Sequence, residues 1–580
     1  MGSRDLSDPI LLELIRNALD ATVEEMAIAL VRTAYSNNLK NSMDMSCALC
    51  DADGRLIAQG LTLPLHLGSV PDAMAHVRRK FAGRIDPGDV FILNDPYAGG
   101  THLPDFYIVK PTFLEGELVG WATSIGHQLD VGGKTPGGNG CDATEIFQEG
   151  LRIPPLKLYA AGRPVEALFE LIERNVRVPR QVLGDVRAQL AACEAGERAY
   201  LKLLAQHGPE RFAACTTALL DQAERLARTA IRAMPPGSYT FTDYLDDDGI
   251  DPDPITLTVR LTVAGDRIIA DFTGSAPQVK GGINSPLPFT KSAVYAAVRH
   301  LIGGEPPNNE GYFRPIEVIA PPGTIVNPVP PAAVAARGLT GFRMANVLFG
   351  ALAQIAPDRV FACEVGGDTG VSIGGYDAER RPFVFLEFLF GSWGGRPNKD
   401  GVDGNSSSVV NFSNNPVEVI ESEYPIAIEQ YGFVPDTGGP GRFRGGLALV
   451  RQYRFLETEG TLQLRTDRRR FLPYGLQGGR PGTPSRNVLT PRAVTELPGK
   501  CTVTIRRDDV FRHVLAGAGG FGDPLDRDPE RVLRDVLEEK ITPAYARREY
   551  GVVIDEATDA VGADATRELR AAMRTATLPR

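Results

Sequence analysis

The side chains best suited to chemistry in this 580-residue sequence are two histidines and an aspartate that flank one predicted hairpin. The chain has only seven histidines, and His102 and His127 stand on either side of a strand-rich segment that begins after Asp105. Imidazole nitrogen with carboxylate oxygen, in glycine-rich loops and without thiolate, is a ligand set that suits Zn, Mn or Fe. The alternative is structural: His127 ends a strand, and the H-x-x-D spacing is a loop cap.

The hairpin determines whether these three residues can meet. Residues 106–126 read as two strands around a turn at Gly116. A hairpin centred there places Asp105 opposite His127 at its open end, where cross-strand Cβ atoms lie about 5 Å apart. His102 precedes Asp105 by three residues, in a loop that can fold back to the same end. The spacing therefore predicts a cluster able to share one metal ion.

Helix and strand signals are mixed along the rest of the chain. Asp8-Pro9 is a helix start, followed by apolar residues at helical spacing up to about residue 34. ITLTVRLTV at 255–263 alternates as a strand with one buried face does. Further helices are expected over 71–81, most of 151–230, 288–302, 342–356 and 528–580, and further strands over 45–50, 55–59, 90–94, 267–272 and much of 390–500.

These signals predict an α+β (mixed α/β) chain with antiparallel or mixed sheets and flanking helices. The change of pattern after Pro235-Pro236 marks a domain boundary. We expect an N-terminal metal-binding domain over 1–235, a β-rich α+β domain over 236–515 and a helical C-terminal tail over 516–580.

The composition excludes several classes of protein. The formal net charge of −10 argues against nucleic acid or an anionic membrane as the main partner. No run approaches the 18 apolar residues of a membrane span, and the N-terminus has no secretory-signal pattern. Seven scattered cysteines do not form a disulfide framework. We therefore expect a cytoplasmic protein.

Four motif-like segments fail as sites. The segment 132–135 (GGKT) lacks the earlier glycine of a phosphate-binding loop, and the glycines at 517–522 precede Asp-Pro where a helix should open. Cys47 and Cys50 stand at i and i+3 of a predicted strand, so they face opposite ways and do not indicate zinc. The acidic run at 246–249 lacks calcium ligands at the required positions. ATP is therefore not expected to bind this chain.

Several longer segments carry a resemblance to a known family. The chain resembles the hydantoinase B/oxoprolinase family in order over nearly its whole length, from about residue 8 to 555, in DMSCALCDADGRL (44–56), LPLHLGS (63–69), NDPYAGGTHLPDF (94–106), GHQLDVGG (126–133), DATEIFQEGLRIPP (142–155), RPIEVIAPPGTIVNP (314–328) and GAGGFGDP (517–524). The family includes second subunits of ATP-dependent hydantoinases and lactamases, one half of 5-oxoprolinases, and subunits of ketone carboxylases.

The resemblance implies a division of labour between two subunits. A hydantoinase A-type ATPase partner, with ATP and Mg, would phosphorylate the substrate oxygen, and the B-type chain would carry one divalent metal. The family's ligands fall on Asp44, His102, Asp105 and His127. The hairpin alone indicates three of these and misses Asp44. Zinc is slightly favoured, with manganese or iron as alternatives.

Four other polar residues are weaker candidates. His66 could line the same cavity, although a plain loop histidine is the alternative. If 144–152 is a helical turn, Glu145 and Glu149 share a face, Glu145 could orient a water, and Arg152 could hold a phosphate. A salt-bridged surface is the alternative for these three.

The sequence thus predicts the metal-bearing subunit of an ATP-dependent cyclic amide hydrolase, acting on a hydantoin, an N-methylhydantoin, 5-oxoproline or a lactam. A hydroxide generated at the metal would attack the phosphorylated carbon, phosphate would leave and the ring would open. Two alternatives stay open: a ketone carboxylase subunit of the acetone or acetophenone type, and a non-catalytic scaffold for the ATPase. We expect the pair to assemble as a dimer of heterodimers, without nucleic acid or membrane.

Overall fold

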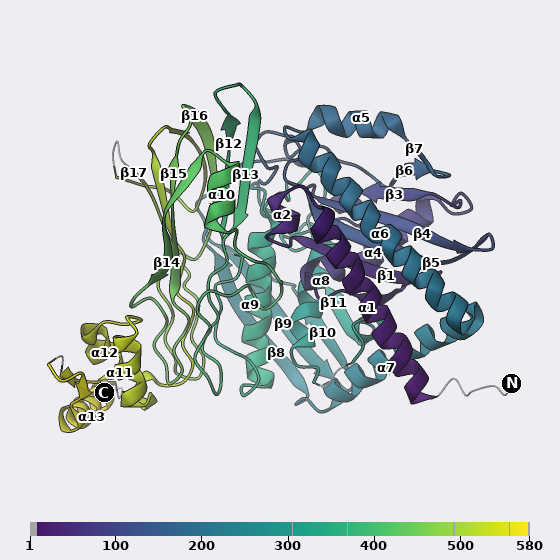
Figure 1. Ribbon diagram of the computed structural model, residues 1–580. Coiled ribbons are helices and arrows are strands. Elements are labelled where there is room, and N and C mark those ends of the chain that lie inside the picture. The colour runs from purple at the N-terminus through teal and green to yellow at the C-terminus, as the bar shows by residue number, and fades with distance from the viewer. Residues whose placement is uncertain (1–7, 304–305, 368, 491–493, 556, 578–580) are drawn as a thin grey trace.

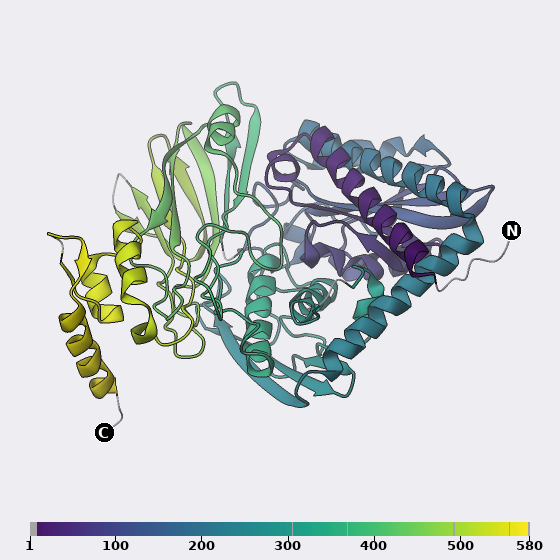
Figure 2. The same cartoon turned by 60° about the horizontal axis from the view of Figure 1, so that its bottom comes forward.

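The computed structural model describes residues 8–303, 306–367, 369–490, 494–555 and 557–577. Four parts follow one another along the chain (Figures 1 and 2). A large sheet with helices comes first, then a smaller sheet with two helices, then a pair of packed sheets, and finally a small helical unit that projects from that pair. The mixed α+β class expected from the sequence is confirmed.

The first part is built on a seven-stranded antiparallel sheet in the order β2-β1-β5-β4-β3-β6-β7. Its strands are β1 (Met45–Asp51), β2 (Leu56–Gln59), β3 (Val90–Leu93), β4 (Asp105–Leu114), β5 (Glu117–His127), β6 (Leu156–Ala160) and β7 (Arg163–Pro164). Its α-helices are α1 (Pro9–Thr33), α2 (Asn37–Lys40), α3 (Pro64–Leu67), α4 (Val70–Lys80), α5 (Glu166–Asn175), α6 (Pro179–His207) and α7 (Pro209–Arg232). The 3-10 turns η1 (Pro96–Ala98) and η2 (Ile146–Gln148) lie in its loops.

Both faces of this sheet are buried, which explains its nearly continuous apolar strands. Helices α1 and α6 pack against β1, β4 and β5 on one face. The other face packs against α4 and the second part of the chain. Cys47 packs in the core beneath α1 and α6, and Cys50 packs in the core shared with α4 and the second part of the chain. The two thiols therefore point to opposite sides of the sheet, as predicted.

The predicted hairpin has the expected register. Asp105 pairs with His127 at its open end, and a single irregularity between Thr112 and Phe113 shifts the pairing near the turn. The predicted first helix is also confirmed, with the Asp8 carboxylate accepting from the Ile10 amide. The prediction for 151–230 was incomplete, because the short strands β6 and β7 precede the helices.

The second part is a four-stranded sheet in the order β11-β10-β9-β8, in which only β10 and β11 run parallel. Helix α9 packs on β8 and β9, α8 packs on α9, and α3 of the first part contacts α8. The elements are β8 (Gly237–Leu245), β9 (Ile255–Ala264), β10 (Arg267–Asp271), α8 (Leu287–Arg299), η3 (Glu310–Phe313), β11 (Ile316–Ile319) and α9 (Arg337–Ile355). Strand β9 alternates between buried and more exposed residues, as predicted.

The third part is a sandwich of two sheets, in the orders β13-β12-β16-β19 and β14-β15-β20-β17-β18. Both sheets contribute to one apolar core, with Val371 and Leu462 on one side and Tyr453 and Phe511 on the other. The elements are β12 (Thr369–Tyr376), β13 (Pro382–Phe388), α10 (Val417–Glu423), β14 (Ile426–Val434), β15 (Ala448–Phe455), β16 (Glu459–Thr466), β17 (Arg486–Thr490), β18 (Thr495–Glu496), β19 (Lys500–Arg506) and β20 (Val510–Val514).

The C-terminal unit contains η4 (Pro524–Asp526), α11 (Pro529–Leu537), α12 (Pro543–Tyr550), β21 (Ile554–Asp555), β22 (Ala560–Val561) and α13 (Ala563–Thr577). In both views it lies at the end of the molecule away from α1 (Figures 1 and 2). Within the part of the chain that the structure describes, no helix is both long and apolar enough to cross a bilayer.

Candidate metal centre

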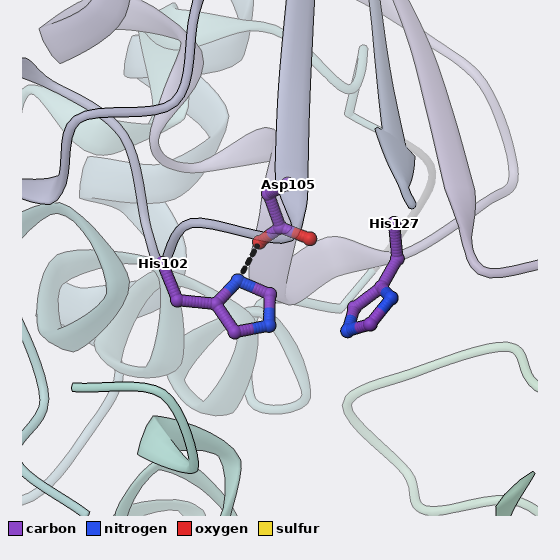
Figure 3. Close-up of side chains that lie close together, drawn as sticks. All are labelled: His102, Asp105 and His127. Atoms are coloured by element: carbon purple, nitrogen blue, oxygen red, sulfur yellow. Dashed lines mark ion pairs between the residues drawn. The ribbon is translucent and has the colours of Figure 1, made fainter. Parts of the chain in front are cut away.

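His102, Asp105 and His127 form a buried cluster in which one potential ligand atom from each residue lies within 4.8 Å of the others. Figure 3 shows both imidazole rings on the same side of the Asp105 carboxylate. The ring centroids of His102 and His127 are 4.9 Å apart. Asp105 and His127 come from the paired ends of β4 and β5, and His102 comes from the loop after η1. The sequence prediction that these three side chains meet is therefore confirmed.

A glycine turn returns the His102 loop to the hairpin. Gly99 has a φ of 96°, in the left-handed region that glycine adopts without a steric penalty. A Cβ at this position would lie 2.7 Å from the Cα of Ala73 in α4, so the loop packs directly on that helix. Local backbone geometry thus places His102 beside the strand end.

The two oxygens of Asp105 have different surroundings. Oδ2 lies 2.9 Å from Nδ1 of His102 and 2.5 Å from Nη2 of Arg337, and it also accepts from the Thr101 hydroxyl. Oδ1 has no hydrogen-bond partner, although it is buried, and it lies 3.5 Å from Nε2 of His66. One face of this carboxylate is therefore fixed, and the other is available to a cation.

Asp44 comes directly before β1 and lines a cavity beside the cluster. Its backbone carbonyl accepts from the amide of His127 at 3.1 Å, which ties the start of β1 to the end of β5. Its Oδ1 is buried without a hydrogen-bond partner, 3.8 Å from Nε2 of His66. Asp44 does not belong to the compact group of three, but it lines the same cavity.

Electrostatics keep the three imidazoles neutral. Burial lowers the pKa of His66 and of His102 to about 4, and lowers the pKa of His127 well below its usual value. Burial, reinforced by the charge of Asp105, raises the pKa of Asp44 well above its usual value. Burial also opposes ionisation of Asp105, but the hydrogen bond from His102, the nearby ring of His66 and the positive charge of Arg337 outweigh it and hold its pKa well below the usual range. Neutral imidazoles keep the lone pairs that a metal needs.

These residues fit a divalent cation. Asp44 Oδ1 and Asp105 Oδ1 are buried acceptors without donors, an arrangement that costs free energy unless a cation or an unseen donor compensates it. The surrounding nitrogen and oxygen donors match Zn, Mn or Fe, and both thiols of the nearby C-x-x-C segment point into apolar cores.

The cluster opens onto a cavity with about 500 Å³ of empty space, counting the solvent at its mouth. Its polar wall consists of Asp44, His66, His102, His127, Asn139, Arg337 and Arg465. Its apolar wall includes Leu63, Leu65, Phe289, Leu339, Phe342, Phe388, Val410 and Phe412. The first three parts of the chain all contribute, so the cavity exists only where they meet.

Arg337 and Arg465 were missed by sequence reasoning. Arg337 begins α9, and its guanidinium stacks on Phe289 at 3.8 Å from the ring centroid. Arg465 belongs to β16 and stacks on Phe388 at 4.7 Å. Phe388 in turn presents its ring to His127, with centroids 5.4 Å apart. No local spacing marks these residues, because the packing of distant sheets brings them to the cavity.

Only some of the weaker candidates lie at the cavity. His66 lines the cavity, as expected. The condition under which Glu145 and Glu149 would share a helical face is not met, because the 3-10 turn η2 covers only the three residues between them. Glu145 is exposed and does not line the cavity. Arg152 pairs with Asp95 at 2.9 Å and does not line it either.

Glu149 is buried behind the cavity wall. Its Oε1 accepts from the amides of Val334 at 2.6 Å and Ala335 at 2.7 Å, just before α9. Burial raises the pKa of Glu149 to about 8, although these two backbone hydrogen bonds oppose the shift. These two hydrogen bonds to Glu149 hold the segment that leads into Arg337 in place.

Comparison with known proteins decides the family. The hydantoinase B/oxoprolinase model matches residues 8–524. The chain belongs to this family. It is 34% identical to the putative B subunit of a D-/L-hydantoinase from Pseudomonas sp. (strain NS671), over 97% of this chain and 98% of that protein. It is also 34% identical to the beta subunit of the caprolactamase of Pseudomonas jessenii, over 94% of this chain and 96% of that one.

Solved structures agree with this family membership. The crystal structure of the ATP-dependent caprolactamase from Pseudomonas jessenii matches with a TM-score of 0.91 and 33% identity, covering 98% of this chain and 100% of that chain. A nucleotide-free acetone carboxylase structure matches with a TM-score of 0.89 over 99% of this chain and 84% of that chain. At 20% identity, the carboxylase match shows a common fold alone. This member of the family is therefore a B-type subunit of the hydantoinase, oxoprolinase and lactamase kind.

Proposed function

We propose that this chain is the metal-bearing subunit of an ATP-dependent cyclic amide hydrolase, acting on a ring that a hydantoinase A-type partner has phosphorylated. The observation that carries the proposal is the pair of unpartnered, buried carboxylate oxygens, Asp44 Oδ1 and Asp105 Oδ1, beside three neutral imidazoles that line one cavity together with Asp44. Such a pair is compensated by a cation held inside the protein.

Asp44, His102, Asp105 and His127 would hold the ion, with zinc favoured and manganese or iron as alternatives. A bound divalent ion supplies Lewis acidity, which makes water acidic enough to act as a nucleophile near neutral pH. The Arg337 and Thr101 contacts to Asp105 Oδ2 keep that carboxylate oriented with Oδ1 free.

The amide must be activated before water can attack it. Its nitrogen lone pair is delocalised into the carbonyl group, so the carbon is a poor electrophile. Transfer of the γ-phosphoryl group of ATP to the carbonyl oxygen, on the partner, makes the carbon electrophilic enough for water to attack it. Two relatives are themselves named as subunits, which supports such a partner, and we expect a dimer of heterodimers.

The residues of this chain would then direct two water additions. Water adds to the activated carbon and loses a proton to His66, whose imidazole lines the cavity in its neutral form. The proton passes to the ring nitrogen, the C–N bond breaks, and an acyl phosphate remains. A second water cleaves this acyl phosphate into the carboxylate and inorganic phosphate. We assign this role to His66; Glu145, the sequence candidate for orienting a water, is exposed outside the cavity.

The scaffold alternative makes a different prediction for the Asp105→Asn complex. This change keeps the shape of the side chain and removes the negative charge. If this chain hydrolyses the activated ring, the reconstituted complex with ATP and a hydantoin or lactam should still release some phosphate but form little ring-opened acid. Phosphate and open-chain product are measured in the same reaction, and metal content is measured on the same sample. Glu145→Gln is the matched control and should keep the wild-type ratio. An unchanged ratio in Asp105→Asn protein that has lost its metal would reject the hydrolytic role.

A further inference from the structure

Arg465 reaches the cavity by crossing a neighbouring strand. It pairs with Gly370 in β12, and Gly370 pairs on its other side with Phe388 in β13. A Cβ on Gly370 would lie 2.1 Å from Nε of Arg465, so the glycine leaves the space through which the side chain passes. The guanidinium then stacks on Phe388, the ring that also contacts His127. Arg465, Phe388 and His127 therefore form a row that ends at the proposed metal centre.

The guanidinium of Arg465 is buried but incompletely paired. The residue is 3% exposed. Nη1 donates to the backbone carbonyl of Asn139 at 3.1 Å, and Nη2 has no hydrogen-bond partner although it is buried. Because Arg465 lines the cavity, its buried, unpartnered donor marks a place for an acceptor there.

Arg465 differs in this respect from the other buried arginines. Among the residues that the structure describes, seven arginines are buried, and six of them form an ion pair with a carboxylate. The six pairs are Arg337 with Asp105, Arg343 with Asp467, Arg444 with Asp403, Arg451 with Glu387, Arg468 with Asp243 and Arg527 with Asp400. Arg465 alone in this group has no ion pair, and a buried cation without a counter-ion is destabilising. The fold therefore maintains this charge for something that is not part of the chain.

The charges in the cavity favour an anion. Asp44, which lines the cavity, and Asp105, which contacts His102 and Arg337 of the cavity wall, offset two positive charges. Arg337, Arg465 and a bound divalent ion would carry four, so two positive charges would remain uncompensated. A phosphoryl group near neutral pH carries close to two negative charges and three acceptor oxygens. The planar fork of arginine matches two of those oxygens.

We propose that Arg465 is the anion-binding residue of this cavity and takes the phosphoryl oxygens of the activated substrate, an inference that rests on the proposed function. The phosphoryl group lies against the Arg465 guanidinium, with the apolar part of the substrate against the hydrophobic wall. An unphosphorylated cyclic amide leaves Nη2 unpaired, so the cavity discriminates in favour of the activated ring. Arg152, the sequence candidate for phosphate, is already paired with Asp95 outside the cavity.

Calorimetry on the purified full-length chain tests this assignment, with inorganic phosphate as the probe. Arg465→Gln should weaken phosphate binding at least tenfold, and Arg465→Lys, which keeps the charge but loses the fork, should give an intermediate affinity. Arg152→Gln is the matched control and should bind phosphate as the wild type does. Metal content and the thermal midpoint are compared for all proteins. If the glutamine variant does not fold, the lysine variant provides the comparison.

Three outcomes would overturn the proposal. The first is no phosphate binding by the wild type, and the second is equal binding by wild type and a folded Arg465 variant with its metal intact. The third concerns the source of the anion, because the carboxylate of the ring-opened product is also an oxyanion. Acetate should bind at least tenfold more weakly than phosphate, and equal affinities would assign the site to the product instead. A wild-type complex that opens no cyclic amide would reject the proposed function, whereas the calorimetric comparison would still decide the role of Arg465.

Discussion

Asp105 and His127 are cross-strand partners at the open end of the β4–β5 hairpin, and both side chains belong to one compact ligand cluster. The rigid pairing of the two strands fixes the separation of their Cβ atoms at about 5 Å. The hairpin therefore presents a carboxylate and an imidazole at a preset spacing. These two side chains would need little reorganisation to hold an ion.

Metal content should depend on the histidines of the cluster. We expect about one divalent ion per chain, and we expect His102→Ala and His127→Ala each to weaken its binding by at least roughly 10- to 100-fold, the loss seen when only an outer partner of a ligand is removed. Elemental analysis after dialysis measures this. His207→Ala, at the end of α6 and outside the cavity, is the control. Full metal occupancy in both cluster variants would place the ion elsewhere.

The apolar wall of the cavity should select substrates by their hydrocarbon surface. Each additional methylene that is buried contributes roughly 0.8 kcal/mol, about a fourfold gain. Across hydantoins with methyl, ethyl and propyl substituents on the same ring, kcat/KM of the complex should rise by about this factor at each step until the cavity is full. A hydroxymethyl substituent, close in size to ethyl, should be worse than ethyl. A flat series, or a preference for the hydroxyl, would contradict the prediction.

Glu149 should make stability fall as the pH rises. Its pKa is raised to about 8 in the folded chain, against an ordinary value of 4.5, so the folded state binds the proton more tightly than the unfolded state does. The resulting stabilisation is complete below about pH 4.5 and is lost as the pH rises to about 8. The full loss is on the order of 5 kcal/mol, an upper bound for a single group.

Glu149→Gln removes this titration and keeps an oxygen that can accept from the amides of Val334 and Ala335. The difference in thermal midpoint between this variant and wild type should therefore move in favour of the variant between pH 5 and pH 9. Glu145→Gln, on the exposed side of the same turn, should show no such trend. If the Glu149→Gln and wild-type midpoints change in parallel over that range, Glu149 does not titrate as described.

The isolated chain should not bind ATP. The glycines at 517–522 pack against other backbone segments: a Cβ on Gly517 would lie 1.8 Å from the carbonyl oxygen of Thr437, and one on Gly519 would lie 2.0 Å from that of Tyr474. These glycines are explained by close packing of loops, which leaves no role for a phosphate. Calorimetry with ATP and Mg²⁺ should give no heat of binding. Micromolar affinity would refute the division of labour between the subunits.

The parts of the site that could be predicted are those determined by local geometry. The register of one hairpin was sufficient to bring Asp105 and His127 together. Asp44 needed a second pairing, between β1 and β5, in which Met45 lies opposite Gly126. Two hairpins were recognisable, but nothing in the residues indicated that they share an edge.

The parts that could not be predicted depend on long-range packing. Arg337 approaches Asp105 from 232 positions away, and Arg465 arrives through a gap left by a glycine on another strand. For Glu145 and Glu149 the local signal was ambiguous, since their spacing fits a helix and the chain forms only a 3-10 turn there. Periodicity predicts which residues share an element, but it does not predict which elements meet.

The contact between Asp105 and Arg337 also determines when the site can form during translation. At translation rates of roughly 5–20 residues per second, Asp105 is made about 10 to 50 s before the arginine that contacts it, 232 positions later. Throughout that interval the nascent hairpin can form, but its carboxylate lacks this cationic neighbour, and the cavity has no walls from the later parts. The first sheet thus emerges with an open, solvated cluster, and the cavity can close only after the chain has been made as far as Arg465.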